Sequence, residues 1–184
     1  MLFRNSATRY ATASVLLHWL MLVLVVIAYA SIELRELFPR GSDPRAALKD
    51  LHALVGLSIL ALALVRLGLR GIAGPVPPIE PAPGAWTRRA AVLVQVGLYA
   101  LLIGVPLVGW GLLSAEGEPI PFFGLDLPPL AGTDEGLAET LEELHEIGGQ
   151  IGYGLIALHA AAGLFHHYLR RDNTLRRMLP GARR

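Results

Sequence analysis

The six histidines of this 184-residue chain are its most informative residues, because all of them lie in or at the end of apolar segments. Ionisable side chains at membrane depth are costly and usually functional. His145, Gly152, His159 and His166 follow one another at intervals of seven residues. Seven residues are nearly two helical turns, so these positions share one stripe of a helix. His145 and His159 are separated by about 21 Å of helical rise and therefore stand at two different depths.

The cysteine-free composition narrows what these histidines could hold. It excludes disulfides, iron–sulfur clusters, thiol catalysis and covalent haem attachment through a C-x-x-C-H motif. A bound metal or cofactor must therefore be held by histidine, methionine or carboxylate. The chain is 53% hydrophobic and only 17% charged, whereas a typical soluble domain is about 25% charged. This composition argues against a disordered chain and a soluble globule, and it indicates a membrane protein.

Four apolar runs are long enough to position the histidines on membrane-spanning helices. They cover about residues 15–34, 46–69, 90–114 and 141–169. Each reaches the roughly 20 residues needed to cross about 30 Å of hydrocarbon. We therefore predict an all-α fold, a membrane-spanning four-helix bundle that forms a single integral membrane domain over residues 1–184. The acidic, proline-containing segment 115–140 is predicted to form a folded cap on the outer face.

The charged residues predict the orientation of this bundle. With four crossings, 12 of the 16 basic residues fall on the side of both termini, and 13 of the 15 acidic residues fall on the other. The positive-inside rule then places both termini in the cytoplasm. The alternative is that the first run is a signal peptide, since Ala28-Tyr29-Ala30 resembles a cleavage site. The run is on the long side for a signal, and the pairing of histidines described next requires this helix to be retained.

Orientation pairs the histidines by depth. The second run begins outside, which places His52 at the level of His145, and the first begins inside, which places His18 at the level of His159. Two stacked His–His pairs across a bilayer most simply bind two b-type haems through axial imidazoles from facing helices. Zinc is a weaker interpretation, because two histidines leave its third and fourth positions unfilled. For any single histidine, a hydrogen bond across the bundle is the alternative.

Further polar residues lie at the same two levels. Arg45, Lys49 and His52 share a helix face, so Lys49 is predicted to bind the propionates of the outer haem. Arg66 lies 14 residues beyond His52 and is predicted to bind those of the inner haem, with snorkelling to the interface as the alternative. His166 is the candidate for hydrogen bonding a quinone or relaying its proton. Its alternative interpretation is a polar interfacial residue.

Several motifs carry a family resemblance that covers nearly the whole chain. The most specific is Gly154-Leu155-Ile156-Ala157-Leu158-His159-Ala160-Ala161-Ala162, followed by His166-His167-Tyr168 and Asp172-Asn173-Thr174-Leu175. The others are His18-Trp19, Glu33-x-Arg35-x-x-Phe38-Pro39-Arg40, His52-x-x-x-Gly56 through to Arg66, and His145-Glu146. By these motifs the chain resembles the bacterial cytochrome b-561 family, and most closely its small four-helix members with superoxide oxidase activity.

The resemblance implies a bacterial inner-membrane protein with two haem b groups. The family's haem ligands fall on His18, His52, His145 and His159, in agreement with the pairing by depth. The implied activity is that of a superoxide:ubiquinone oxidoreductase. It would oxidise superoxide to dioxygen at the periplasmic side and pass the electrons through the haems to ubiquinone.

Outer-sphere oxidation of superoxide needs a haem edge near the surface and a field that draws the anion inward. The outer cations Arg35, Arg40, Arg45 and Lys49 are the candidates for steering superoxide. The 13 acidic residues of the same face would repel superoxide unless they lie away from its entrance. Quinone reduction also requires two protons, and His166 and Arg66 are the candidates for the quinone site.

Two other function classes remain open. The same histidines would serve a haem-bearing electron-transfer subunit that links a dehydrogenase partner to the quinone pool, although the outer cap would occupy the docking face. A haem-free structural or transport protein would show no b-type absorption band. Nucleic-acid binding is not indicated, because the C-terminal arginines lie beside the membrane, where anionic lipid is the simpler partner.

Overall fold

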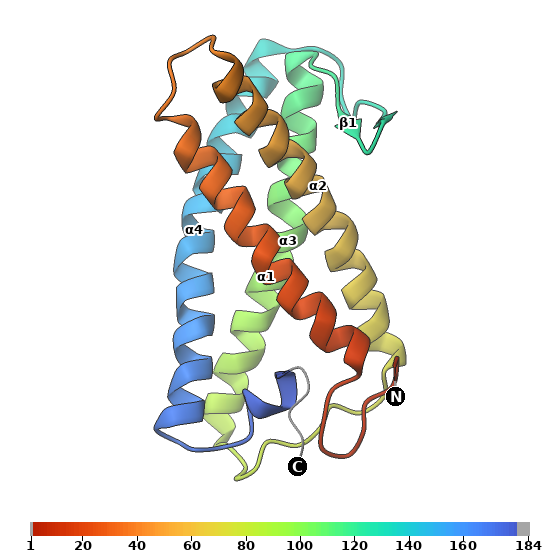
Figure 1. Ribbon diagram of the computed structural model, residues 1–184, viewed down its shortest axis with the longest axis vertical. Helices are drawn as coiled ribbons and strands as arrows, with labels where there is room; N and C mark the ends of the chain where they lie inside the picture. The colour runs from red at the N-terminus through yellow and green to blue at the C-terminus, as the bar shows by residue number, and fades with distance from the viewer. Residues whose placement is uncertain (1, 180–184) are drawn as a thin grey trace.

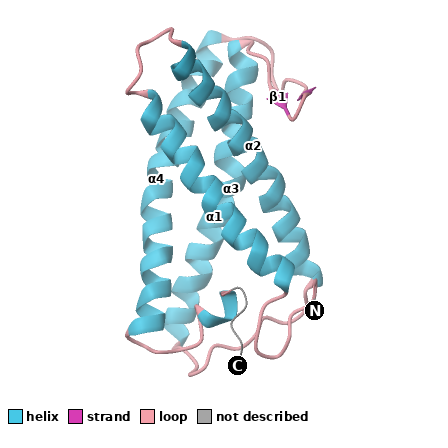
Figure 2. Ribbon diagram, in the orientation of Figure 1, coloured by secondary structure: helices cyan, strands magenta, loops and turns pink. Residues whose placement is uncertain are grey.

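The computed structural model describes residues 2–179, and most of them lie in four long helices that form an elongated bundle (Figures 1 and 2). The helices are α1 (Thr12–Arg35), α2 (Asp43–Ile72), α3 (Ala85–Glu116) and α4 (Glu135–Tyr168). All four are long and apolar enough to cross a membrane. The predicted all-α, membrane-spanning four-helix fold is therefore confirmed. Residues 1 and 180–184 of the predicted domain lie outside the described residues.

Each helix begins earlier than its apolar run, and the first three also end later. The difference is largest for α4, which starts at Glu135 rather than near residue 141. The carboxylate of Asp134 accepts a hydrogen bond from the backbone N–H of Leu137 at 2.9 Å and so caps this helix. The apolar pattern marks the part of a helix that lies in hydrocarbon, whereas capping groups in water determine where the helix begins.

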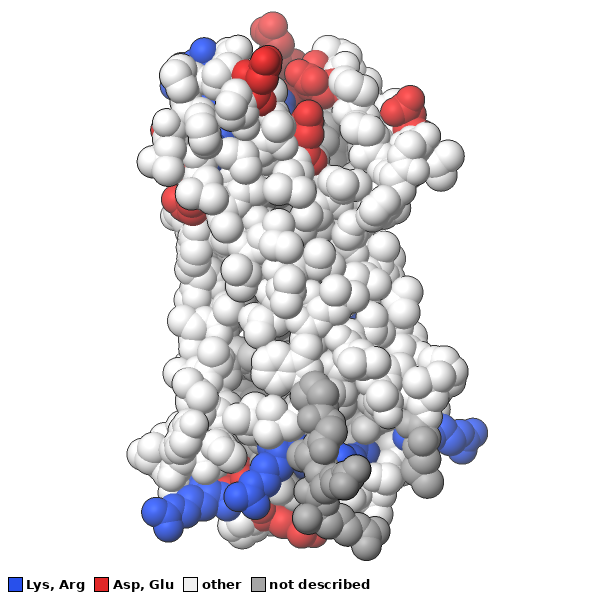
Figure 3. All heavy atoms as spheres, in the orientation of Figure 1, with Lys and Arg blue, Asp and Glu red and all other residues white. Residues whose placement is uncertain are grey.

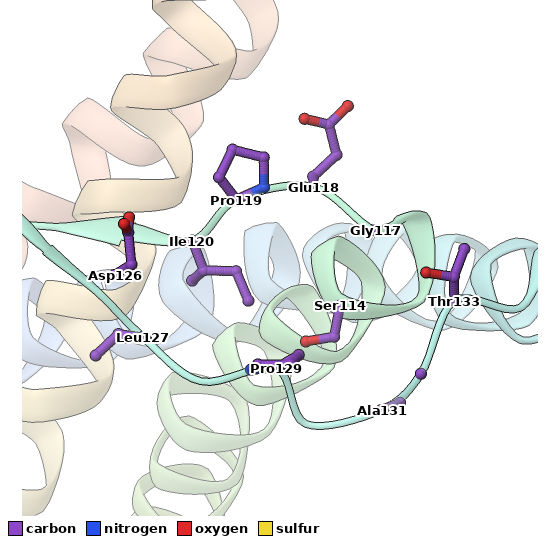
Figure 4. Close-up of a pocket in the computed structure, with 11 residues that line it drawn as sticks. Ser114, Gly117, Glu118, Pro119, Ile120, Asp126, Leu127, Pro129, Ala131 and Thr133 are labelled. Atoms are coloured by element: carbon purple, nitrogen blue, oxygen red, sulfur yellow. The ribbon is translucent and has the colours of Figure 1, made fainter.

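The cap is consequently shorter than predicted and spans 117–134. It contains a two-stranded antiparallel hairpin of β1 (Pro121–Phe122) and β2 (Leu125–Asp126). Trp110 and Ser114 attach the cap to α3. The Trp110 indole donates to the carbonyl of Pro128 at 3.1 Å, and the Ser114 hydroxyl accepts from the backbone N–H of Leu130 at 2.9 Å. An open pocket of about 410 Å³ lies under the cap, and no histidine lines it (Figure 4).

The helices pack in the order α1–α2–α3–α4. Helix α1 packs along α2, α3 along α4, and α2 against α3. Among the described residues, α1 and α4 make no comparably close backbone contact, and side chains connect them instead. The Tyr29 hydroxyl donates to the carbonyl of Gly149 at 2.8 Å, and the Tyr153 hydroxyl donates to the Glu33 carboxylate at 2.7 Å.

The two ends of the bundle carry opposite charge. Lysine and arginine gather at the end where the N-terminal segment, the 73–84 loop and the last described residues meet, and acidic residues gather at the other (Figures 1 and 3). A broad band with almost no charge separates them (Figure 3). We call these the basic end and the acidic end. The band has the composition expected of a surface in contact with lipid.

The residues after α4 fold back under the basic end. This C-terminal segment, residues 172–179, includes a short 3₁₀ helix, η1 (Arg176–Met178). The Trp19 indole donates to the carbonyl of Met178 at 2.6 Å. The buried Arg177 donates to the carbonyl of Pro77 and lies over the Tyr10 ring. The C-terminal segment is thus fixed to α1, to the N-terminal segment and to the loop between α2 and α3.

Candidate cofactor site

The structure brings His52 of α2 and His145 of α4 together near the acidic end. Their ring centroids are 5.9 Å apart and the ring planes differ by 79°. His52 Nδ1 lies 2.9 Å from the carbonyl oxygen of Ala28, and His145 Nδ1 lies 3.0 Å from that of Val105. A carbonyl can only accept a hydrogen bond, so both Nδ1 atoms carry the proton and both Nε2 atoms keep a free lone pair. This is the arrangement usual for histidines that bind a metal.

His18 of α1 and His159 of α4 form a second pair nearer the basic end. Their ring centroids are 6.1 Å apart, with the planes at 78°. Here Arg66 Nη1 lies 3.1 Å from His18 Nδ1. A guanidinium only donates, so His18 Nδ1 accepts in this contact and the ring proton is on Nε2. Nε2 of His18 could bind a metal only after that proton had moved to Nδ1 and Arg66 had turned away.

The separation of the rings in each pair is close to that of two imidazoles holding one haem iron. A metal–nitrogen distance of about 2.0–2.1 Å and a nitrogen-to-centroid distance of about 1.1–1.2 Å would place the centroids of two imidazoles on one metal about 6.2–6.6 Å apart. The observed separations are within a few tenths of an ångström of this range. Within residues 2–179, no group of three or more His, Cys, Asp and Glu side chains could hold a metal ion. Two imidazoles suffice for haem iron, because the porphyrin supplies the other four ligands.

Glycines allow the close approach of elements around the pair at the acidic end. A Cβ on Gly109 of α3 would lie 2.8 Å from His145 Cε1. A Cβ on Gly148 of α4 would lie 2.6 Å from Cγ2 of Val105, whose carbonyl binds His145. A Cβ on Gly152 would meet the Tyr29 hydroxyl. Sequence reasoning did not find Gly109, because a single sequence does not distinguish it from the other glycines of the chain.

Arg35 and Arg45, two of the four candidates for steering superoxide, both contact Glu36. Arg45 Nη2 lies 2.8 Å from Glu36 Oε1, and Arg35 Nε lies 3.5 Å from the same oxygen. The hydrogen bond from Arg45 is the main reason that the pKa of Glu36 lies below its ordinary value. Arg45 also donates to the carbonyls of Arg35 and Phe38, so it holds the loop between α1 and α2. Arg40 has no carboxylate within ion-pair distance among residues 2–179.

Lys49 lies against the cap. Its Nζ is 3.4 Å from Glu116 Oε2 and 3.9 Å from Glu118 Oε1. These two carboxylates partly neutralise the positive charge of Lys49, which was predicted to bind the propionates of the outer haem. A contact between Lys49 and a haem propionate thus stays a prediction.

His166 lies at the basic end of α4 and contacts the C-terminal segment. Its Nδ1 is 2.5 Å from Oδ2 of Asp172, a residue that is only 3% exposed. The other carboxylate oxygen, Oδ1, accepts from the backbone N–H of Thr174 at 2.9 Å. Burial raises the pKa of Asp172, but the hydrogen bonds from His166 and Thr174 outweigh burial and leave the pKa below its ordinary value. In the sequence Asp172 stands only in a family motif, and nothing there indicates a role for it.

A bundle of four membrane-spanning helices, with facing histidines paired at two depths, defines a class of integral membrane proteins that bind b-type haem within the bundle. The chain belongs to the prokaryotic cytochrome b561 family, whose family model matches residues 9–181. Membership makes it a haem-binding electron-transport protein, and its four membrane-capable helices fit a bacterial membrane.

Individual relatives cover almost the whole chain. Cytochrome b561 homolog 1 of Escherichia coli (strain K12) is 37% identical over 172 residues, which are 94% of this chain and 97% of that protein. The probable superoxide oxidase CybB of Yersinia pestis is 37% identical over 175 residues, 95% of this chain and 98% of that protein. Cytochrome b561 homolog 2 of Escherichia coli is 29% identical over 182 residues, 97% of this chain and 95% of that protein.

Proposed function

We propose that this protein oxidises superoxide to dioxygen at its acidic end and passes the electrons through two haem b groups to ubiquinone at its basic end. The observation that carries the proposal is the presence of one histidine pair near each end, with a member of each pair on α4. A relative that matches 95% of this chain is named a probable superoxide oxidase. Two superoxide anions become two dioxygen molecules, and ubiquinone takes up two electrons and two protons.

The four histidines are the proposed haem ligands. His52 and His145 would hold the outer haem, and His18 and His159 the inner one. When bound, the haems supply reversible one-electron transfer. The chain's own contribution is to orient the imidazoles, because the carbonyls of Ala28 and Val105 fix the Nδ1 protons at the acidic end.

Arg66 is the proposed partner of the inner haem propionates. It lies beside His18 in the structure, and binding of iron by His18 Nε2 would release it from that contact. A guanidinium that has lost its nitrogen acceptor in a mostly apolar bundle needs an anion, and a propionate is an anion that the inner haem itself would bring.

The proposed orientation places the basic end in the cytoplasm and the acidic end in the periplasm. The positive-inside rule supports it, since the arginine-rich end holds both the N-terminal and the C-terminal segments (Figures 1 and 3). Superoxide would then meet the His52–His145 pair from the periplasm, and ubiquinone would receive electrons near His166 at the cytoplasmic side.

Among the four candidates for steering superoxide, we expect Arg40 to contribute most. Arg35, Arg45 and Lys49 each have a carboxylate within ion-pair distance, and Arg40 has none among the described residues. A paired cation presents a weaker field to an approaching anion than an unpaired one.

The test uses the purified, haem-loaded protein and follows the b-type absorption bands by stopped flow. Superoxide should reduce the haems, superoxide dismutase should prevent this, and a ubiquinone analogue should reoxidise them. His52→Leu should remove the outer haem and abolish reduction by superoxide. His159→Leu should remove the inner haem, keep reduction by superoxide and abolish reoxidation by quinone.

Two outcomes would refute the proposal. Haem spectra that superoxide leaves unchanged would favour an electron-transfer subunit, which would become reduced only with a dehydrogenase partner. If His52→Leu and His159→Leu are well folded but each loses both haems, or each keeps both, the pairing of the histidines is wrong.

A further inference from the structure

We propose that Asp172 is a positioning residue for quinone reduction: its buried carboxylate holds the Nδ1–H of His166, so that Nε2 faces ubiquinone and delivers the proton. This inference rests on the proposed function, because it assigns a role within the same quinone site.

The contact between the two side chains is close and enclosed. His166 Nδ1 lies 2.5 Å from Asp172 Oδ2, and the Asp172 side chain is completely shielded from solvent. Within residues 2–179, neither lysine nor arginine forms an ion pair with this carboxylate. A buried carboxylate needs hydrogen-bond donors or a positive charge nearby. His166 supplies a donor in either protonation state and a positive charge when it is protonated.

The backbone fixes Asp172 in this position from two directions. Arg171 has φ +55°, a left-handed conformation that turns the chain back after α4. The backbone N–H of Asp172 then donates to the carbonyl of His166 at 3.2 Å. Asn173 secures the segment to the loop between α2 and α3, where its side chain accepts from the backbone N–H of Glu80 at 3.0 Å and donates to the carbonyl of Pro78 at 3.3 Å.

This position assigns separate tasks to the two ring nitrogens of His166. Nδ1 is bound to Asp172, and Nε2 makes no hydrogen bond within the described part of the chain. His166 lies seven residues beyond His159, or about 10.5 Å of helical rise nearer the basic end. The free nitrogen therefore lies between the proposed inner haem and the interface at which a membrane quinone exposes its head group to water.

The proton and electron balance follows from this geometry. As the quinone is reduced, one of its oxygens takes the proton from Nε2 of the imidazolium. His166 is left as an imidazole whose remaining proton stays on Nδ1, held by Asp172. Water from the basic end returns a proton to Nε2, and a second transfer completes ubiquinol. The carboxylate remains ionised throughout and keeps hold of Nδ1–H, so only Nε2 gives up and regains a proton, as in other carboxylate–histidine pairs.

The test measures the two half-reactions of the haem-loaded protein separately. Asp172→Asn should leave reduction by superoxide unchanged and slow reoxidation by ubiquinone-1 about tenfold or more. The loss should appear in kcat rather than in KM. Adding formate to Asp172→Ala should restore part of the rate, because formate can replace the missing carboxylate.

Asn173→Ala is the matched control. It removes both side-chain hydrogen bonds of Asn173 to the neighbouring loop but keeps the carboxylate next to it. Its rate of quinone reduction should stay within about twofold of the original protein. His166→Gln should lose at least as much rate as Asp172→Asn, and the double variant should be no slower than His166→Gln alone.

The outcomes separate this inference from the proposed function. Equal rates for Asp172→Asn and the original protein would overturn the inference, as would an equal loss in Asn173→Ala. An unimpaired His166→Gln would instead refute the quinone site itself. Two haems per chain in each variant establish that it has folded. If Asp172→Asn does not fold, the response of Asp172→Ala to formate decides. A rate of quinone reduction that formate leaves unchanged would overturn the inference.

Discussion

Replacing Gly109 by alanine is expected to weaken haem binding at the His52–His145 pair and to leave the His18–His159 pair intact. The new Cβ would lie 2.8 Å from His145 Cε1 and 3.1 Å from His145 Nδ1. Ordinary carbon–carbon contacts begin at about 3.5 Å, so the ring must move by about 0.7 Å. His145 cannot make this movement and keep its present contacts.

The movement has a calculable cost. His145 Nδ1 is 3.0 Å from the Val105 carbonyl, and a shift of about 0.7 Å away from Gly109 would lengthen this bond beyond the range of a hydrogen bond. An unsatisfied buried donor costs about 1–3 kcal/mol, which corresponds to about 5- to 150-fold weaker binding. The affected site is the outer haem, since His145 is its proposed ligand.

The assay is a haem titration of purified Gly109→Ala, followed by redox titration of the b-type bands. Gly104→Ala is the matched control, because Gly104 lies on the same helix and its Cβ would meet nothing within 4 Å. Both changes raise helix propensity by about 1 kcal/mol, so any difference between them reports on His145. Equal haem affinity and equal potentials in the two variants would refute the reasoning.

Two further predictions concern the two ends of the bundle. Glu116→Gln should release Lys49 from its nearer carboxylate, 3.4 Å away, and leave Glu118 at 3.9 Å. Superoxide should then reduce the haems about two- to fivefold faster at low ionic strength, and the gain should be smaller near 0.15 M salt. An equal gain in Glu139→Gln would contradict a local effect of Glu116. At the other end, the pKa of Asp172 is lowered, so its carboxylate stabilises the docked C-terminal segment fully above about pH 4, the ordinary carboxyl value. This stabilisation is lost as pH falls through the lowered pKa. Pepsin should therefore cleave the segment only in strongly acidic solution, and rapid cleavage already at pH 5 would contradict the prediction.

The four helices and the meeting of the histidines could be predicted because a bilayer imposes simple geometry. Its thickness fixes the length of an apolar run, and the rise per residue converts sequence separation into depth. His52 was expected at the level of His145, and the structure brings their rings to 5.9 Å. His18 was expected at the level of His159, and their rings lie 6.1 Å apart. Depth alone was enough to select these partners.

The remaining features depend on contacts that depth does not specify. Lys49 and Glu116 are 67 residues apart, and their pairing depends on how the end of α3 packs beside α2. Gly109 matters because one face of α3 touches the His145 ring, which a helical period alone does not indicate. Asp172 reaches His166 because the chain reverses after α4, and no apolar pattern encodes that reversal. The helix ends differed from prediction because capping in water determines them.

Both histidine pairs take one member from α4, which is synthesised after α1, α2 and α3. Neither pair can exist while the ribosome has produced only α1, α2 and α3, even though His18 and His52 are already in the membrane. Because α1 and α4 lack close backbone packing among the described residues, a haem held by His18 and His159 would also join α1 to α4. Uptake of haem at either pair would then require that α4 has been synthesised and inserted, and a chain that stops before α4 would have neither pair.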